Sequence, residues 1–282
     1  MARRVVDNKR RAVLAVLAAG AFGGLIVALL SLLFLPAVGA LFVFVVVAAA
    51  LAGLAWWGSE PLARRLIDAQ PADPLRHARL FNLMEALCVN AGVPPPSLYV
   101  VADAGLNALT IGRTPRHATL IVTEGLLQHL NRVELEGVLA HELAHVKSDD
   151  ILISTVSVAL FGILGSPARA AARGGAGAIG GYVLLPFSAA AGLGLQLVVG
   201  RQREEAADLS AVGLTRYPPA LVAALEKMQE SGTLVRTGGA PTAHLWLGDP
   251  VGPPDPDRLG WLSRLFETHP PLDARIEALR EL

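Results

Sequence analysis

Cysteine is almost absent from the sequence. It occurs once among 282 residues, as Cys88. A single thiol excludes an intrachain disulfide and every metal site that is built from several cysteines. Because Cys88 lies in a stretch with apolar residues at helical spacing, residues 80–90, we interpret it as a core residue and not as a reactive thiol.

Charge is also scarce. Charged residues make up 17% of the chain and hydrophobic residues 53%, whereas about 25% charged residues are usual in soluble domains. The 24 basic residues balance the 24 acidic ones, so no net charge would attract nucleic acid. The composition excludes a nucleic-acid partner and indicates contact with membrane lipids.

The first long charge-free run covers residues 12–59. One membrane span needs about 20 apolar residues, so this run is long enough for two. A turn at residues 35–39, around Pro36, predicts transmembrane helices at 12–34 and 40–57, with Trp56 and Trp57 at the membrane interface. A cleaved signal peptide is the alternative, but its apolar core would be only about 7–15 residues long.

Two later charge-free runs cover residues 151–168 and 174–200. They could be buried helices of a soluble domain or re-entrant segments, but we favour a second transmembrane hairpin. The expected fold class is α+β, mostly helical, with about four transmembrane helices. The expected organisation is a basic tail (1–11), a hairpin (12–57), a polar part (58–150), the second hydrophobic hairpin (151–200) and a second polar part (201–282).

The flanking charges predict the orientation. Basic residues precede the first run and follow the second, whereas the turn between them has none: Arg3, Arg4, Lys9, Arg10, Arg11, Arg64 and Arg65. The positive-inside rule then places the N-terminus and both polar parts in the cytoplasm. The sequence thus predicts a multi-pass protein of the inner (plasma) membrane, although Arg169 and Arg173 would lie outside and argue mildly against this orientation.

The first polar part combines helix and strand patterns. Residues 74–90 have apolar residues at helical spacing, and residues 98–101, 107–111 and 119–122 are predicted strands. A further helix begins after Asn131, because Asn131 with Glu134 three residues later forms a capping-box pattern.

This helix contains the sequence His-Glu-Leu-Ala-His at residues 141–145. Residues four apart share one helical face, so His141 and His145 can bind the same metal ion, and Glu142 can take a proton from a water molecule on that metal. Two neutral nitrogens and an oxygen suit zinc, which makes its water acidic and polarises a scissile carbonyl. The pattern indicates zinc-dependent hydrolysis; the alternative is a surface helix with two solvated histidines.

Residues 203–208, Arg-Glu-Glu-Ala-Ala-Asp, follow the last hydrophobic run. Glu204 and Asp208 are four apart and share a helical face. Glu204 can supply the third zinc ligand, and Asp208 can accept the other ring N–H of a ligating histidine. The alternative is a solvated acidic helix start, which is our interpretation of Glu205.

Several blocks together resemble the membrane gluzincin peptidases, a family that includes the heat-shock protease HtpX and the CAAX prenyl proteases. The blocks are residues 94–100, 107–112, 122–127, 134–145, 204–208 and 268–276. The hydrophobic runs around the zinc helix also resemble HtpX, whereas CAAX prenyl proteases are longer. Leu109 and Glu205 stand where relatives often have aromatic residues.

The resemblance implies one zinc ion per chain, with His141, His145 and Glu204 as ligands, Glu142 as general base and Asp208 as support for His141. It also implies an edge strand that holds an extended substrate, formed by Asn107, Ala108, Leu109 and Thr110. In the last block we expect a further catalytic donor to the oxyanion, either His269 or Arg275. The alternative is that this block is only a helix start.

Three functions remain open at this point. The leading hypothesis is a zinc endopeptidase that cleaves membrane or misfolded proteins for quality control. The others are a processing peptidase for lipidated substrates and a catalytically inactive membrane scaffold. The remaining histidines lack a partner at ligand spacing, and we interpret them as surface or structural residues: His77, His117, His129 and His244.

Overall fold

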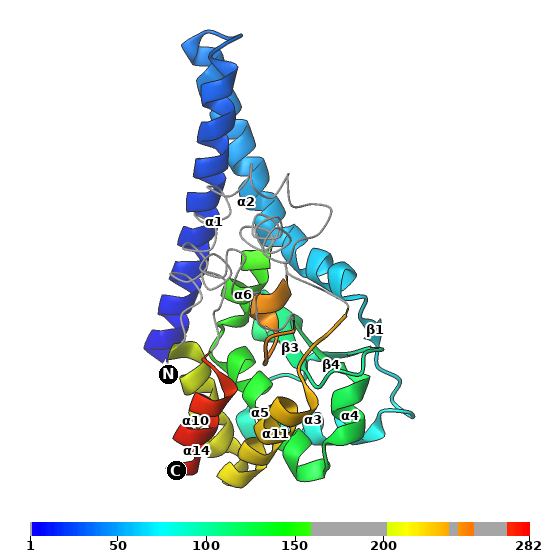
Figure 1. Cartoon of the computed structure of the whole chain (residues 1–282). Helices are drawn as coiled ribbons and strands as arrows, with labels where there is room; N and C mark the ends of the chain where they lie inside the picture. The colour runs from blue at the N-terminus through cyan, green and yellow to red at the C-terminus, as the bar shows by residue number, and fades with distance from the viewer. Residues whose placement is uncertain (1, 159–201, 237–241, 251–269) are drawn as a thin grey trace, which may run out of the picture.

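The computed structural model describes residues 2–158, 202–236, 242–250 and 270–282 (Figure 1). Helices surround one four-stranded sheet, and a long helical hairpin projects from this body. The fold class is therefore mostly helical α+β, as expected.

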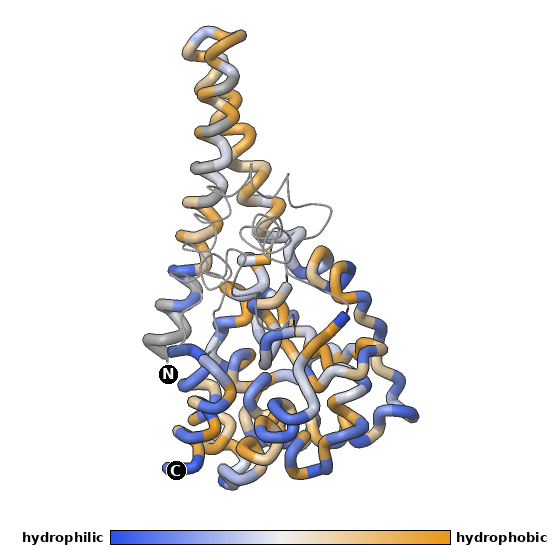
Figure 2. The backbone as a smooth tube through the Cα atoms, viewed as in Figure 1, coloured by the Kyte–Doolittle hydropathy of each residue, from blue (hydrophilic) through white to orange (hydrophobic). Residues whose placement is uncertain are grey.

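The hairpin consists of α1 (Ala2–Ser31) and α2 (Ala37–Ile67). Both helices are long and apolar enough to cross a membrane: 18-residue windows within residues 10–29 and 37–67 have mean hydropathies of 2.5 and 2.7. Figure 2 shows that hydrophobic residues follow one another along the hairpin, and among them Leu17, Phe42 and Leu54 are 57%, 71% and 66% exposed. Such a large exposed apolar surface is typical of a membrane contact.

The ends of these helices correct our predicted bounds of 12–34 and 40–57. Helix α1 already begins in the basic tail, and α2 continues past Trp57 to Ile67. A helix satisfies its own backbone hydrogen bonds, so the end of an apolar run is not the end of the helix. Helix α2 ends where Asp68 adopts a left-handed φ of 55° and its N–H bonds to the carbonyls of Arg64 and Arg65.

The second predicted hairpin lies largely outside the described residues. Only α6 (Ile151–Ser157) belongs to the described part. All of its residues are buried, and it packs against α1, α2 and the sheet. The start of the third hydrophobic run is therefore enclosed by protein.

The three predicted strands are confirmed, and no end differs from its predicted position by more than one residue. They are β2 (Ser97–Val101), β3 (Ala108–Gly112) and β4 (Ala118–Thr123), and η1 (Pro115–His117) connects the last two. A short strand β1 (Gln70–Pro71) completes the order β1-β2-β4-β3. Strand β4 pairs parallel with β2 and antiparallel with β3, so β3 lies at the edge of the sheet.

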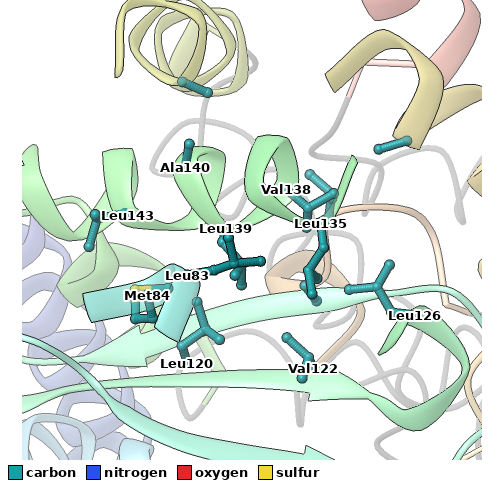
Figure 3. Packing of buried hydrophobic residues seen from close by; sticks show 14 of the residues in the cluster. Leu83, Met84, Leu120, Val122, Leu126, Leu135, Val138, Leu139, Ala140 and Leu143 are labelled. Atoms are coloured by element: carbon teal, nitrogen blue, oxygen red, sulfur yellow. The ribbon is translucent and has the colours of Figure 1, made fainter. Parts of the chain in front are cut away.

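Side chains of the sheet point alternately into two cores. Leu120 and Val122 pack with α3 (Ala78–Ala91), α5 (Arg132–Lys147) and α11 (Pro218–Ser231) (Figure 3). Cys88 lies in this core, which confirms its interpretation. Ile121 points to the second core, which includes Ile67 at the end of α2 and Trp246.

Helix α5 lies at the centre of the body. Its neighbours are α3, α11 and α10 (Gln202–Thr215), and α14 (Leu272–Arg280) packs on α10 and α11. A Cβ atom on Gly137 would come within 2.9 Å of the backbone of Leu221, so this glycine permits the close approach of α11. The remaining described elements are α4 (Glu124–His129) and η3 (Ala243–Leu245).

Candidate metal centre

The helix that carries the His-Glu-x-x-His sequence begins as predicted. The Asn131 side chain accepts hydrogen bonds from the N–H groups of Val133 and Glu134, at 2.9 and 3.0 Å. The Glu134 carboxylate accepts the N–H of Asn131 at 2.8 Å, which completes the capping box. This cap fixes the start of α5, two and a half turns before its first histidine.

The donor atoms of His141, His145 and Glu204 converge. The Nε2 atoms of the two histidines are 3.1 Å apart, and the Glu204 carboxylate oxygens lie 3.5 and 3.7 Å from them. All three residues are buried. Donors about 2.0–2.2 Å from a tetrahedral zinc ion lie roughly 3.2–3.6 Å from one another, so this set fits zinc and leaves one coordination position for water.

Asp208 contacts the ring nitrogen of His141 that does not face the other two metal-binding residues, as the sequence predicts. The Asp208 carboxylate lies 2.8 Å from Nδ1 of His141, which turns Nε2 toward Glu204 and His145. Arg275 on α14 donates to both Asp208 oxygens, from Nε at 2.9 Å and from Nη2 at 2.7 Å. This His141–Asp208–Arg275 series links the zinc site to the C-terminal helix.

His145 has an equivalent support that our sequence reading missed. Asp150 lies 3.0 and 3.1 Å from Nδ1 of His145, and Arg203 donates from Nε to Asp150 at 3.2 Å. The chain turns back after α5 because Asp149 adopts a left-handed φ of 57°. An aspartate five residues after the second histidine was the available signal, but Asp150 also precedes an apolar run and looked like its polar boundary.

Burial and charge act in opposite directions on these groups. Burial lowers the pKa of His141, but its bonds to Asp208 and Glu204 outweigh burial and raise the pKa to about 9. Burial raises the pKa of Asp208, yet Arg275 and His141 hold it below its usual range. Arg203 and His145 likewise outweigh burial and lower the pKa of Asp150. Both aspartates are therefore carboxylates at neutral pH.

Glu142, the residue after His141 on α5, lines the same space as the three metal-binding residues. It is 3% exposed, and Thr110 on β3 donates from Oγ1 to one carboxylate oxygen at 2.7 Å. Thr110 thus fixes one oxygen of Glu142, so that the other oxygen can accept a proton. This contact brings the predicted substrate strand and the predicted base together.

The predicted substrate residues lie beside a segment that the sequence reading did not connect with the site. Residues 243–248, which we call the edge segment, pair with the outer edge of β3: Leu247 N–H donates to the Ala108 carbonyl at 2.8 Å, and Trp246 lies opposite Leu109. Asn107 is fully buried, and its amide bonds to both main-chain groups of Gly248. Asn107 thus holds the edge segment, and its contact with substrate stays a prediction.

The other predicted residues have varied positions. His269 lies outside the described residues. Arg275 is buried behind His141, and its role as an oxyanion donor stays a prediction. Glu205 is exposed, as we interpreted it. His244 is buried at the site, where its Nε2 lies 3.1 Å from the Ser154 carbonyl.

Comparisons with known proteins agree with this geometry. Residues 74–282 match peptidase family M48. A protease HtpX homolog of Tropheryma whipplei (strain Twist) is 35% identical over 95% of this chain and 92% of its own length. A protease HtpX homolog of Caldanaerobacter subterraneus subsp. tengcongensis is 34% identical over 81% of this chain and 80% of its own length. The crystal structure of S. mikatae Ste24p aligns with a TM-score of 0.48 and 19% identity, over 85% of this chain and 57% of that one.

Proposed function

We propose a function for this chain, which belongs to peptidase family M48 and is a zinc metallopeptidase. It is a membrane-anchored endopeptidase that cleaves membrane or misfolded proteins on the cytoplasmic side. The observation that carries the proposal is the intact buried set of Glu142, His141, His145 and Glu204 at the base of an exposed apolar hairpin. The proposal includes one zinc ion per chain, bound by the one set of ligands found among the described residues.

Each residue around the site has its own role in the reaction. Zinc, when bound by His141, His145 and Glu204, supplies the Lewis acidity that activates water and polarises the scissile carbonyl. Glu142 takes a proton from the attacking water at the carboxylate oxygen that Thr110 does not hold, and delivers it to the leaving nitrogen. Asp208 and Asp150 keep the two histidines in the tautomer that leaves Nε2 for the metal.

Strand β3 is the surface on which a substrate would lie. In an antiparallel pair, alternate residues direct their main-chain groups to the same edge. The outward groups of Ala108 and Gly112 bond to Leu247 and Thr155, so those of Thr110 face the same edge. A substrate strand that pairs with Thr110 would place its backbone next to Glu142.

The hairpin supports the membrane anchor and its orientation. Arg10 and Arg11 precede the apolar surface of α1, and Arg64 and Arg65 follow that of α2. Both basic ends lie on the side of the catalytic body, so the positive-inside rule favours a cytoplasmic active site. Labelling of a cysteine at position 131 in a Cys88→Ser chain tests this: a cytoplasmic body is labelled only after the cells are opened, and labelling of intact cells would reverse the orientation.

Quantitative proteomics of membranes with wild-type or Glu142→Gln enzyme tests the substrate class. Accumulation of many unrelated membrane or misfolded proteins with the variant supports quality control. Accumulation of one lipidated class would instead favour a processing peptidase. The space at the site is about 10 Å³ in the part of the chain described here, roughly one water, so no prenyl group fits in this conformation.

A further inference from the structure

A second, larger cavity lies between the N-terminal end of α1 and the zinc-binding body. Its volume is about 430 Å³, and its described lining includes Asn8 and Arg11 from α1, Ser148 and Asp150 after α5, and Gln202 and Arg203 at the start of α10. Asn8 donates to the Ser148 carbonyl at 3.1 Å, which ties α1 to the rim of this cavity. The cavity is distinct from the space that borders Glu142, and Arg203 lines both.

Two arginines give this cavity its chemical character. Arg203 uses Nε to bind Asp150, whereas its buried Nη1 has no hydrogen-bond partner in the part of the chain that the structure describes. Arg11 is exposed at the other side of the cavity. The one acidic residue among the described lining, Asp150, already contacts both Arg203 and His145. The Arg203 side chain is 14% exposed and lines the cavity, so an anion there would form charge-assisted hydrogen bonds with the exposed part of its guanidinium.

We propose that this cavity binds a phosphate group, carried by an anionic lipid headgroup. Arg11 is the last charged residue before the charge-free run of α1, so it lies at headgroup level if the hairpin spans the membrane. To this extent the inference rests on the proposed function. The phosphate bridges the guanidinium groups of Arg11 and Arg203, and Asn8 and Gln202 line the same space.

Native mass spectrometry of the full-length protein in non-ionic detergent tests this site. After delipidation, phosphatidylglycerol should bind at least about tenfold more tightly than phosphatidylcholine. Arg11→Gln and Arg203→Gln should each weaken phosphatidylglycerol by about tenfold, because each removes a charge-assisted contact. Arg10→Gln is the matched control: it removes the same charge from the adjacent position, which does not line the cavity in the described structure, and should leave binding unchanged.

Binding measurements with soluble phosphates identify the source of the phosphate group. If glycerol 3-phosphate or inorganic phosphate binds as tightly as the lipid, with the same dependence on Arg11, the site takes a soluble phosphate. Equal losses with Arg10→Gln and Arg11→Gln, or no preference for phosphatidylglycerol, would overturn the proposal. Extraction of membranes with carbonate tests the anchor separately, so its failure is distinguishable from failure of the site.

A different observation concerns the edge segment. Its Trp246 is fully buried opposite Leu109, and Arg275 donates from Nη1 to the Leu247 carbonyl at 3.1 Å. Val235 N–H also bonds to the Pro250 carbonyl, and Thr233 to the Asp249 carbonyl, which secures the following residues. The edge segment therefore occupies, within the chain itself, the edge of β3 that a substrate strand needs.

We infer that the edge segment is an autoinhibitory strap, which leaves β3 before a protein substrate can pair with it. Its antiparallel direction continues from Leu247 beside Ala108 toward Leu245 beside Thr110, where the substrate backbone would lie. Leu245, Trp246 and Leu247 also line the space around Glu142. Because Arg275 contacts both Asp208 and Leu247, release of the strap and support of His141 are connected through one side chain.

A disulfide that locks the strap tests this inference. Leu109 and Trp246 form a pair flanked by the bond from Leu247 to Ala108, so they are a non-hydrogen-bonded pair with Cα atoms about 4.5 Å apart, within disulfide range. In a Cys88→Ser chain, oxidised Leu109→Cys/Trp246→Cys should lose at least about 90% of casein cleavage, which reduction by a phosphine restores. The single-cysteine chains, treated alike, should not change on oxidation. Zinc content should stay constant throughout.

A locked chain that cleaves casein as fast as its reduced form would overturn the strap. If the double variant does not fold, Leu247→Pro provides a second test, because it removes the N–H that bonds to Ala108 together with the buried leucine side chain of the strap. It should raise casein cleavage several-fold, and an unchanged or lower rate in a folded, zinc-loaded protein would contradict the inference. If neither the wild-type protein nor folded, zinc-loaded Leu247→Pro protein cleaves casein, the proposed function fails instead, so the two failures are distinguishable.

Discussion

The two zinc histidines have the same kind of support but receive it from different parts of the molecule. His141 contacts Asp208, which accepts two hydrogen bonds from Arg275, and the Arg275 side chain is only 2% exposed. His145 contacts Asp150, which accepts one bond from Arg203, whose side chain is 14% exposed. The first series joins α5 to α10 and α14 within the core, and the second lies beside the cavity at α1.

This difference separates a rigid support from an adjustable one. If Arg275 moved, the buried Asp208 would lose two hydrogen bonds from a guanidinium and keep only its contact with His141, which is a costly arrangement. Arg203 borders a cavity of about 430 Å³, so it can exchange part of its contact with Asp150 for another partner. We therefore expect the support of His141 by Asp208 and Arg275 to determine whether zinc binds. The support of His145 by Asp150 and Arg203 should modulate how tightly zinc binds.

The largest expected difference between the two supports is in zinc affinity, and substitution of the two aspartates measures it. Asp208→Asn should weaken zinc binding by about 100-fold and Asp150→Asn by about tenfold, since carboxylates behind metal-bound histidines contribute roughly 10–100-fold. Asp208→Asn leaves the charge of Arg275 close to the metal, whereas Arg203 can turn toward its cavity. Competition with a chelator of known zinc affinity measures both constants. Equal losses would mean that the two supports are equivalent.

Substitutions of the two arginines should lower the unfolding free energy of the protein by different amounts. Arg275→Gln removes both arginine hydrogen bonds from Asp208 in the core, where only the contact with His141 remains, and should cost about 3–5 kcal/mol. Arg203→Gln should cost only about 1–2 kcal/mol, because Asp150 keeps its contact with His145 beside a polar cavity. Unfolding of the detergent-solubilised protein, followed by tryptophan fluorescence, gives both values. A larger loss for Arg203→Gln would reverse the assignment of the rigid side.

A smaller effect should appear as a pH dependence in zinc-free protein. The pKa of His141 is raised to about 9 in the folded chain, above its unfolded value of about 6.5. The folded state then holds a proton that the unfolded state releases, so this contribution is complete below about pH 6.5 and is lost as the pH rises through about 9. The melting temperature of EDTA-treated protein should fall across this window. His141→Gln should flatten the profile, and an unchanged slope would assign it to another group.

The sequence predicted the parts of this site that repeat on a helix. His141 with His145, and Glu204 with Asp208, are separated by four residues, and this spacing alone places each pair on one face. The strand patterns predicted β2, β3 and β4 for the same reason, because alternation and burial are local properties. Helix bounds were less certain, as Pro61 and the basic tail show, because helical hydrogen bonding continues where hydropathy changes.

Contacts between distant segments could not be predicted in this way. Arg203 and Asp150 are 53 residues apart and their meeting has no periodicity. The edge segment combines a short 3-10 helix with residues that pair with a strand 137 positions earlier, as the Leu109–Trp246 pair shows (246 − 109). His244 therefore looked like an isolated histidine, although its burial at the site depends on that pairing.

The most direct test of the central claim is zinc content measured together with casein cleavage, for purified wild type, Glu142→Gln and Glu204→Gln. Wild type and Glu142→Gln should each hold one zinc per chain, and only wild type should cleave. Glu204→Gln should lose most of its zinc, because it lacks the third ligand. A wild-type chain without zinc, or a Glu142→Gln chain that cleaves casein at a near-normal rate, would contradict the assignment of this site.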